Sequence, residues 1–125
     1  ILIRRLYTLG LRTLKSEDQL MTITVTISYP STPGSKFDMD YYLATHLKLV
    51  GKCWGDKLIS ARAIKGVATP NPETPPLYQV VAILEVESVQ VLQDVLEAHG
   101  AEIMGDIPNT TDLEPVIQIS ENWAS

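Results

Sequence analysis

The sequence predicts an α+β domain in which two helices cover one face of a four-stranded antiparallel sheet, with the elements in the order βαββαβ. Two observations lead to this prediction. Four short segments have the composition of β-strands, and two longer segments repeat apolar residues every three or four positions, as amphipathic helices do. The strand-like segments lie at both ends of the domain and as a pair between the two helix-like segments.

Length and composition limit the class of protein. A chain of 125 residues forms one domain with a hydrophobic core, and its 45% apolar and 20% charged residues are typical of soluble globular proteins. No stretch approaches the roughly 18 apolar residues of a membrane span, and a net charge of −5 disfavours a nucleic-acid partner. The single cysteine, Cys53, cannot form an internal disulfide. We therefore expect a cytoplasmic protein that binds neither nucleic acid nor membrane.

Residues 1–20 differ from the remainder of the chain, and we expect them to form an N-terminal extension outside a domain of residues 21–125. They contain four basic residues, and a helix would place leucines on one face and most basic residues elsewhere. The extension lacks the long apolar core of a secretory signal. Two alternatives remain open, a targeting peptide of another kind or a segment that docks on the domain or on a neighbour.

The first half of the domain predicts a strand followed by a helix. Apolar residues alternate with Thr and Ser over residues 22–29, which is typical of a half-buried strand. After a turn-rich loop, Asp38 is a candidate N-cap, with Phe37 and Tyr42 spaced as a hydrophobic staple around it. The helix is expected to end near Gly55.

The second half predicts a strand pair, a helix and a last strand. Residues 57–66 form a weak strand, residues 66–76 form an exposed connector that four prolines keep irregular, and residues 77–87 form a central strand. Ser88 is a candidate cap for the second helix, and residues 112–120 form the last strand. This order corresponds to the ferredoxin-like split βαβ arrangement, which leaves one sheet face uncovered. A homodimer is the simplest cover for that face.

A histidine in the apolar stripe of the first helix is the principal candidate for chemistry. At about 100° per residue, Met39, Leu43 and Val50 lie within about 40° of one another, and His46 lies about 20° to their side. Tyr42 precedes His46 by four residues, so their rings can share a proton or a ligand atom. Two interpretations remain open, a core histidine bonded to a backbone carbonyl or a histidine that lines a pocket.

The spacing of the other reactive residues gives little support for a second catalytic pair or a metal site. Cys53 is seven residues from His46, about 10 Å along a helix, which excludes a hydrogen-bonded pair. His99 lies at the edge of the second helix's apolar face and could approach His46. A zinc site would need a third ligand, for which Glu102 and Asp106 are the candidates. We predict no metal and no cofactor.

Large side chains provide the remaining candidates for ligand binding. They are either core residues or part of a ligand pocket together with His99, and they are Tyr29, Trp54, Tyr78 and Met104. The sequence contains no nucleophile-elbow, P-loop or dinucleotide-binding motif.

Residues 28–50 and 99–121 resemble the EthD family, named for ethyl tert-butyl ether degradation, and the resemblance covers about residues 22–121. The family's first motif, Tyr-x-x-x-His-x-Pro-Leu, falls on Tyr42 and His46, with lysine in place of the proline. Its second motif corresponds to "EIMGDIPN", expected as a turn after the second helix.

The resemblance implies a dimeric α+β barrel, formed by two ferredoxin-like subunits, with a pocket between each sheet and its helices. The superfamily includes cofactor-free monooxygenases, haem-degrading enzymes, cyclases, isomerases and dehydratases, so the fold does not select one activity. One hypothesis is an enzyme for a small apolar or aromatic oxygenated compound, with His46 as general acid or base and Tyr42 assisting. The second is a non-catalytic binding or accessory protein of a cytochrome P450 ether-degrading system. A haem-binding variant is a third option.

Overall fold

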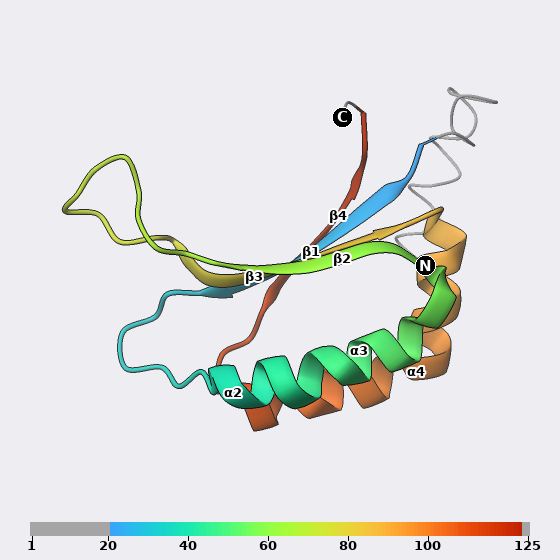
Figure 1. Ribbon diagram of the computed structural model, residues 1–125, viewed down its shortest axis with the longest axis horizontal. Helices are drawn as coiled ribbons and strands as arrows, with labels where there is room; N and C mark the ends of the chain where they lie inside the picture. Colours follow the sequence, from blue (N-terminus) through green and yellow to red (C-terminus); the bar gives the residue numbers. More distant parts are fainter. Residues whose placement is uncertain (1–20, 124–125) are drawn as a thin grey trace.

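The computed structural model describes residues 21–123, and the predicted N-terminal extension lies outside them. Its single sheet is antiparallel, with the strand order β2-β3-β1-β4. The strands are β1 (Ile23–Pro30), β2 (Leu58–Lys65), β3 (Tyr78–Val86) and β4 (Val116–Glu121). Both helical segments lie on the same face of this sheet (Figure 1). The predicted α+β class and ferredoxin-like βαββαβ order are therefore confirmed.

The first helical segment changes its winding along its length. It comprises α2 (Met39–Tyr41), the π-helical turn η2 (Tyr42–His46), α3 (Leu47–Trp54) and the 3₁₀ turn η3 (Gly55–Lys57). Asp38 caps its start by accepting the backbone N–H of Tyr41 at 3.0 Å. The α3 helix ends at Gly55, whose φ of 56° favours glycine. The cap and the end are therefore where the sequence predicts them.

The π-helical turn alters which side chains face the sheet. A π turn takes more residues than an α turn, so a constant 100° per residue no longer describes the segment. Leu43, expected on the inner stripe, is 55% exposed. Tyr41, which precedes the π turn, donates a hydrogen bond to Asp106 of α4.

The second helix is longer than the sequence predicts. The α4 helix (Val89–Thr110) begins with Ser88 accepting the Val91 N–H at 3.2 Å, and it continues through Pro108. The prediction that "EIMGDIPN" forms a turn after the second helix is therefore wrong. Proline lacks a backbone N–H, so Pro108 removes one hydrogen bond from the last turns of α4. The helix still continues to its end, where the Thr111 N–H bonds to the Ile107 carbonyl at 3.0 Å.

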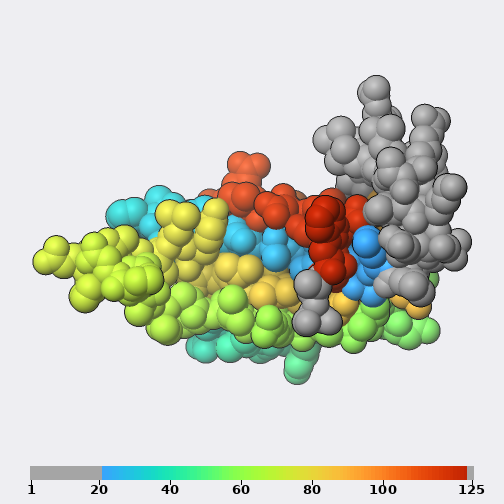
Figure 2. All heavy atoms as spheres, turned by 90° about the horizontal axis from the view of Figure 1, so that it is seen from above, coloured from blue at the N-terminus to red at the C-terminus, as the bar shows by residue number. Residues whose placement is uncertain are grey.

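The hydrophobic core lies between the sheet and the helices. Alternate residues of β1 and β3, such as Val25 and Leu84, are buried against Leu92 and Val95 of α4. The opposite face of the sheet carries no helix among the described residues (Figure 1). Viewed from above, atoms of all four strands are in view on that side (Figure 2). No helix within residues 21–123 is long and apolar enough to cross a membrane.

Candidate functional site

A cavity of about 130 Å³ lies between the sheet and both helical segments. Its wall is mainly aliphatic, with residues from β1, β3, β4, α3 and α4 that include Val25, Leu84, Ile119, Val50 and Ile107. Three lining residues are at least 40% exposed, and they are Leu96, Met104 and Ile117. Since these three belong to α4 and β4, the cavity reaches the surface between these two elements.

His46 places an ionisable group in this apolar wall. The residue is 4% exposed, and its Nδ1 lies 2.9 Å from Oδ2 of Asp106 on α4. With the carboxylate ionised, Nδ1 carries the proton and donates it, which leaves Nε2 as the nitrogen available to a ligand. The partner of the ring is therefore a carboxylate, not the backbone carbonyl of the core interpretation.

Asp106 is held by two further donors besides the imidazole. The Tyr41 hydroxyl donates to Oδ1 at 2.5 Å, and Nδ2 of Asn109 donates to the same oxygen at 3.1 Å. Burial raises the pKa of Asp106, but the hydrogen bonds from Tyr41, Asn109 and His46 and the His46 charge outweigh it, so the pKa lies below its ordinary value. The hydrogen bond to Asp106 in turn raises the pKa of Tyr41. The carboxylate is therefore held in its charged form.

Tyr42 also lines the cavity and carries a polar hydroxyl. It is 1% exposed and stacks on His46, with 5.7 Å between ring centroids and 19° between planes. Burial raises the pKa of Tyr42 to about 12, so the phenol stays protonated. Its hydroxyl has no hydrogen-bond partner among the described residues. A buried hydroxyl without a partner is uncommon, and beside a cavity it points to a ligand or water.

Most of the predicted site residues line the cavity, and two do not. Besides His46 and Tyr42, the cavity wall contains Tyr29, Trp54 and Met104, whereas Tyr78 and His99 are not among its lining residues. His99 lies with Glu102 instead, 3.7 Å from Nδ1 to Oε1.

Sequence reasoning missed the network behind His46. The sequence predicts Asp106 only as a candidate metal ligand, and Tyr41 and Asn109 are not among the predicted site residues. The available signal was a lone aspartate one turn beyond Ile103, on the inner flank of α4. That signal gives no indication of its partner sixty residues earlier in the chain.

The βαββαβ fold and the apolar cavity, with a buried histidine in its wall that bonds to a partly buried carboxylate, define a class of small α+β proteins with a pocket between sheet and helices. Neither a protein-family model nor a curated protein matches the sequence. Solved structures do match. An EthD-like protein from Ralstonia eutropha JMP134 is 35% identical, with a TM-score of 0.78 over 83% of this chain and 94% of that chain. The chain belongs to the EthD-like family.

A second solved structure agrees in fold alone. It is an ethyl tert-butyl ether degradation (EthD) family protein from Bacillus halodurans C-125, with 17% identity and a TM-score of 0.55 over 82% of this chain and 98% of that chain. At this identity the match supports the arrangement of elements and carries no information about the ligand.

Proposed function

We propose that the protein binds a small apolar or aromatic compound with an oxygen function in its cavity and transforms it by proton transfer through His46. The observation that carries this proposal is the His46–Asp106 pair, with 2.9 Å between Nδ1 and Oδ2. The imidazole of this pair lies in the wall of a mainly apolar cavity. An imidazole in such a wall, bonded to a carboxylate, has an energetic cost, which a role in chemistry explains.

The geometry supports His46 as a general base that later acts as an acid. Asp106 fixes the ring orientation and the Nδ1–H tautomer, so the lone pair of Nε2 can accept a proton from a ligand C–H or O–H bond. The carboxylate then stabilises the imidazolium that forms. The same proton can return to another atom of the ligand, as isomerisation, dehydration or cyclisation requires.

Tyr42 supplies the complementary donor. Its hydroxyl is protonated at neutral pH and lacks a partner in the described structure, so it can donate to a ligand oxygen. A donor at that oxygen stabilises the negative charge that develops when His46 removes a proton from an adjacent carbon. The two rings therefore act on neighbouring atoms of one ligand.

The size of the cavity limits the ligand. A dry apolar cavity of about 150 Å³ admits benzene, and this cavity measures about 130 Å³. A single ring or a branched chain of similar volume with one oxygen function fits this space. Binding without turnover, as in an accessory protein of an ether-degrading system, would use the same cavity and the same Tyr42 hydroxyl.

Hydrogen–deuterium exchange of acetophenone in D₂O, followed by NMR, tests the proposal. The ketone offers a ring, an oxygen for Tyr42 and α-hydrogens for His46. We expect the protein to bind acetophenone and to accelerate exchange of its α-hydrogens. His46→Gln should lower the exchange rate by about 100-fold or more, and Tyr42→Phe should lower it about tenfold.

Thr45→Ala is the matched control, because Thr45 is adjacent to His46 but is exposed and absent from the cavity wall. It should exchange acetophenone at the wild-type rate. Binding without exchange in the wild-type protein would support the accessory role instead. Exchange that survives in His46→Gln, or acetophenone that fails to bind, would contradict the proposed chemistry.

We also propose a homodimer formed through the sheet face that no described helix covers. The face includes exposed apolar side chains, with Ile64 and Val116 47% and 50% exposed. A sheet face that no described helix covers and that carries exposed apolar side chains can serve as a partner surface.

A further inference from the structure

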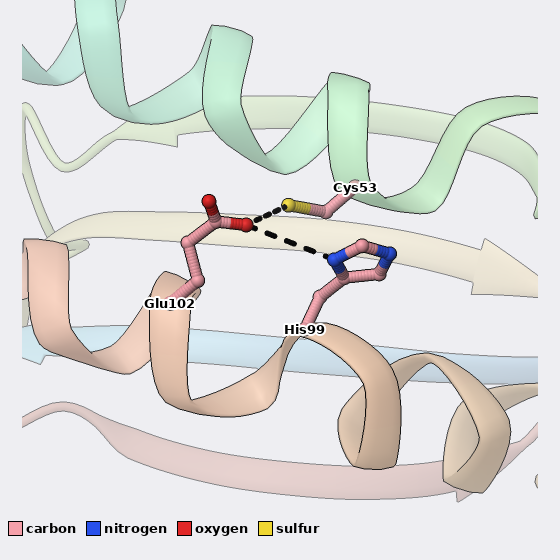
Figure 3. Close-up of side chains that lie close together, drawn as sticks. All are labelled: Cys53, His99 and Glu102. Atoms are coloured by element: carbon pink, nitrogen blue, oxygen red, sulfur yellow. Dashed lines mark hydrogen bonds and ion pairs between the residues drawn. The ribbon is translucent and has the colours of Figure 1, made fainter.

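A second cluster of reactive side chains lies between α3 and α4, outside the cavity wall. The thiol of Cys53 donates to Oε1 of Glu102 at 3.2 Å, and Nδ1 of His99 lies 3.7 Å from the same oxygen. One ligand atom from each of the three residues lies within 4.8 Å of the others. All three side chains point toward one another across the two helices (Figure 3).

The two separations from Oε1 of Glu102 are close to those of a tetrahedral zinc site. Bonds of about 2.3 Å to sulfur and about 2.0–2.2 Å to nitrogen and oxygen, at tetrahedral angles, place neighbouring ligand atoms about 3.3–3.6 Å apart. The 3.2 Å and 3.7 Å separations therefore need shifts of only a few tenths of an ångström. The His99 side chain is 42% exposed, so its ring has room to move closer to the sulfur.

The donor set favours a transition metal over calcium or magnesium. A thiolate and an imidazole are soft and borderline ligands, which suit zinc, whereas calcium and magnesium prefer oxygen alone. His99 and Glu102 occupy positions i and i+3 on α4, and α3 supplies Cys53 on the facing side. The two helices thus bring the three donors close together before any ion binds.

The solvent side of the cluster supplies room for an ion to enter. Cys53 is buried, at 9% exposed, whereas the side chains of His99 and Glu102 are 42% and 58% exposed. Three protein ligands with one accessible side correspond to a zinc ion with an open fourth position. The net charge of −5 also favours a cation over an anion at this surface.

We propose that Cys53, His99 and Glu102 bind one zinc-class divalent transition-metal ion, with water as the fourth ligand. Binding replaces the thiol proton of Cys53, which passes to solvent, and the ion bonds to the resulting thiolate, to Nδ1 of neutral His99 and to the Glu102 carboxylate. This site differs from the arrangement weighed from the sequence, which paired His99 with His46. His46 is bound to Asp106 instead, and Cys53 is the third ligand.

Titration of the reduced full chain with Zn²⁺ against a chromophoric chelator tests the site. We expect one tightly bound ion per chain. Cys53→Ser, His99→Gln and Glu102→Gln should each weaken binding at least tenfold. Glu97→Gln is the matched control, because Glu97 is an exposed acidic residue of α4 outside the cluster, and it should bind Zn²⁺ as the wild type does.

Co²⁺ provides a readout that depends on the ligands themselves. The wild-type complex should show the absorption of tetrahedral cobalt and a sulfur-to-metal charge-transfer band, and Cys53→Ser should lose that band. Circular dichroism without metal identifies any variant that fails to fold. Affinity unchanged in both Cys53→Ser and His99→Gln, a cobalt spectrum without the sulfur band, or no Zn²⁺ binding by the reduced wild type would overturn the proposal.

Discussion

Asp106 accepts more hydrogen bonds from residues of the candidate site than any other side chain there. It accepts hydrogen bonds from Tyr41, Asn109 and His46, and its side chain is 12% exposed. Charge-assisted hydrogen bonds are the stronger ones, and each of these three is lost or weakened when the carboxylate is neutral. The charge of Asp106 should therefore stabilise the fold as well as orient the imidazole.

Acid titration of Asp106→Asn against the wild type tests this role. The pKa of Asp106 is lower in the folded chain than the ordinary value of 3.8. A lowered folded pKa gives a contribution that is fully present above the unfolded pKa and is lost as pH falls through the folded pKa. The wild type should therefore have the higher unfolding free energy at pH 5, and the difference should shrink toward pH 2.

Urea denaturation at one-unit pH intervals from 5 to 2 measures this difference. A difference that stays constant or grows in acid would show that the carboxylate charge does not stabilise the fold. The comparison needs no ligand, so its outcome is independent of the proposed chemistry.

The residue scale also shows what the sequence could and could not predict about the site. The four-residue spacing correctly placed Tyr42 and His46 side by side, because i and i+4 remain neighbours through one helical turn. Periodicity could not give the His46–Asp106 pair, because its two members meet only when α3 and α4 pack together.

At the scale of elements, two glycines differ in whether the surrounding structure leaves room for a side chain. Gly66 follows β2, and its N–H bonds to the Gln79 carbonyl at 3.0 Å. A Cβ at Gly66 would clash with the Tyr78 carbonyl oxygen, whereas a Cβ at Gly51, inside α3, would meet no atom within 4 Å. The two glycines therefore predict opposite effects of the same substitution.

Gly66→Ala should destabilise the protein by about 1–3 kcal/mol, because the added methyl group forces the backbone near β2 and β3 apart. Gly51→Ala should stabilise it by about 0.5–1 kcal/mol, because alanine loses less conformational entropy in a helix. Urea denaturation of both variants measures the two changes. Equal stability of Gly66→Ala and the wild type would mean that the backbone relaxes around the methyl group.

Element boundaries could be predicted where local chemistry determines them. Asp38 and Ser88 cap the helices as expected, and the first three strands begin and end within about a residue of the prediction. The last strand begins at Val116 and not at residue 112, because Thr111 forms a bridge with Phe37 before the chain reaches the sheet. That pairing is a tertiary contact, which strand periodicity does not contain.

At the scale of the whole molecule, the order of strands and helices was predictable, whereas the partner of the outer sheet face was not. Register places Ile64, Val81, Ser28 and Val116 in one row across β2, β3, β1 and β4. Their side chains share the face opposite the helices, because residues that pair across strands point to the same side. A sequence specifies this face but does not specify what covers it.

A substitution in the centre of that row tests the proposed dimer. In dilute solution the wild type should sediment at about twice the monomer mass of 13.8 kDa. Val81→Asp should sediment as a monomer, because a dimer formed through this face would bury an unpaired carboxylate on each subunit. Leu43→Asp introduces the same charge at an apolar residue of the helical layer that is 55% exposed, so this control should remain a dimer. Circular dichroism establishes that both variants are folded. A wild-type protein that sediments as a monomer, or a Val81→Asp variant that stays dimeric, would contradict an interface on this sheet face, and the exposed apolar side chains would then need another partner.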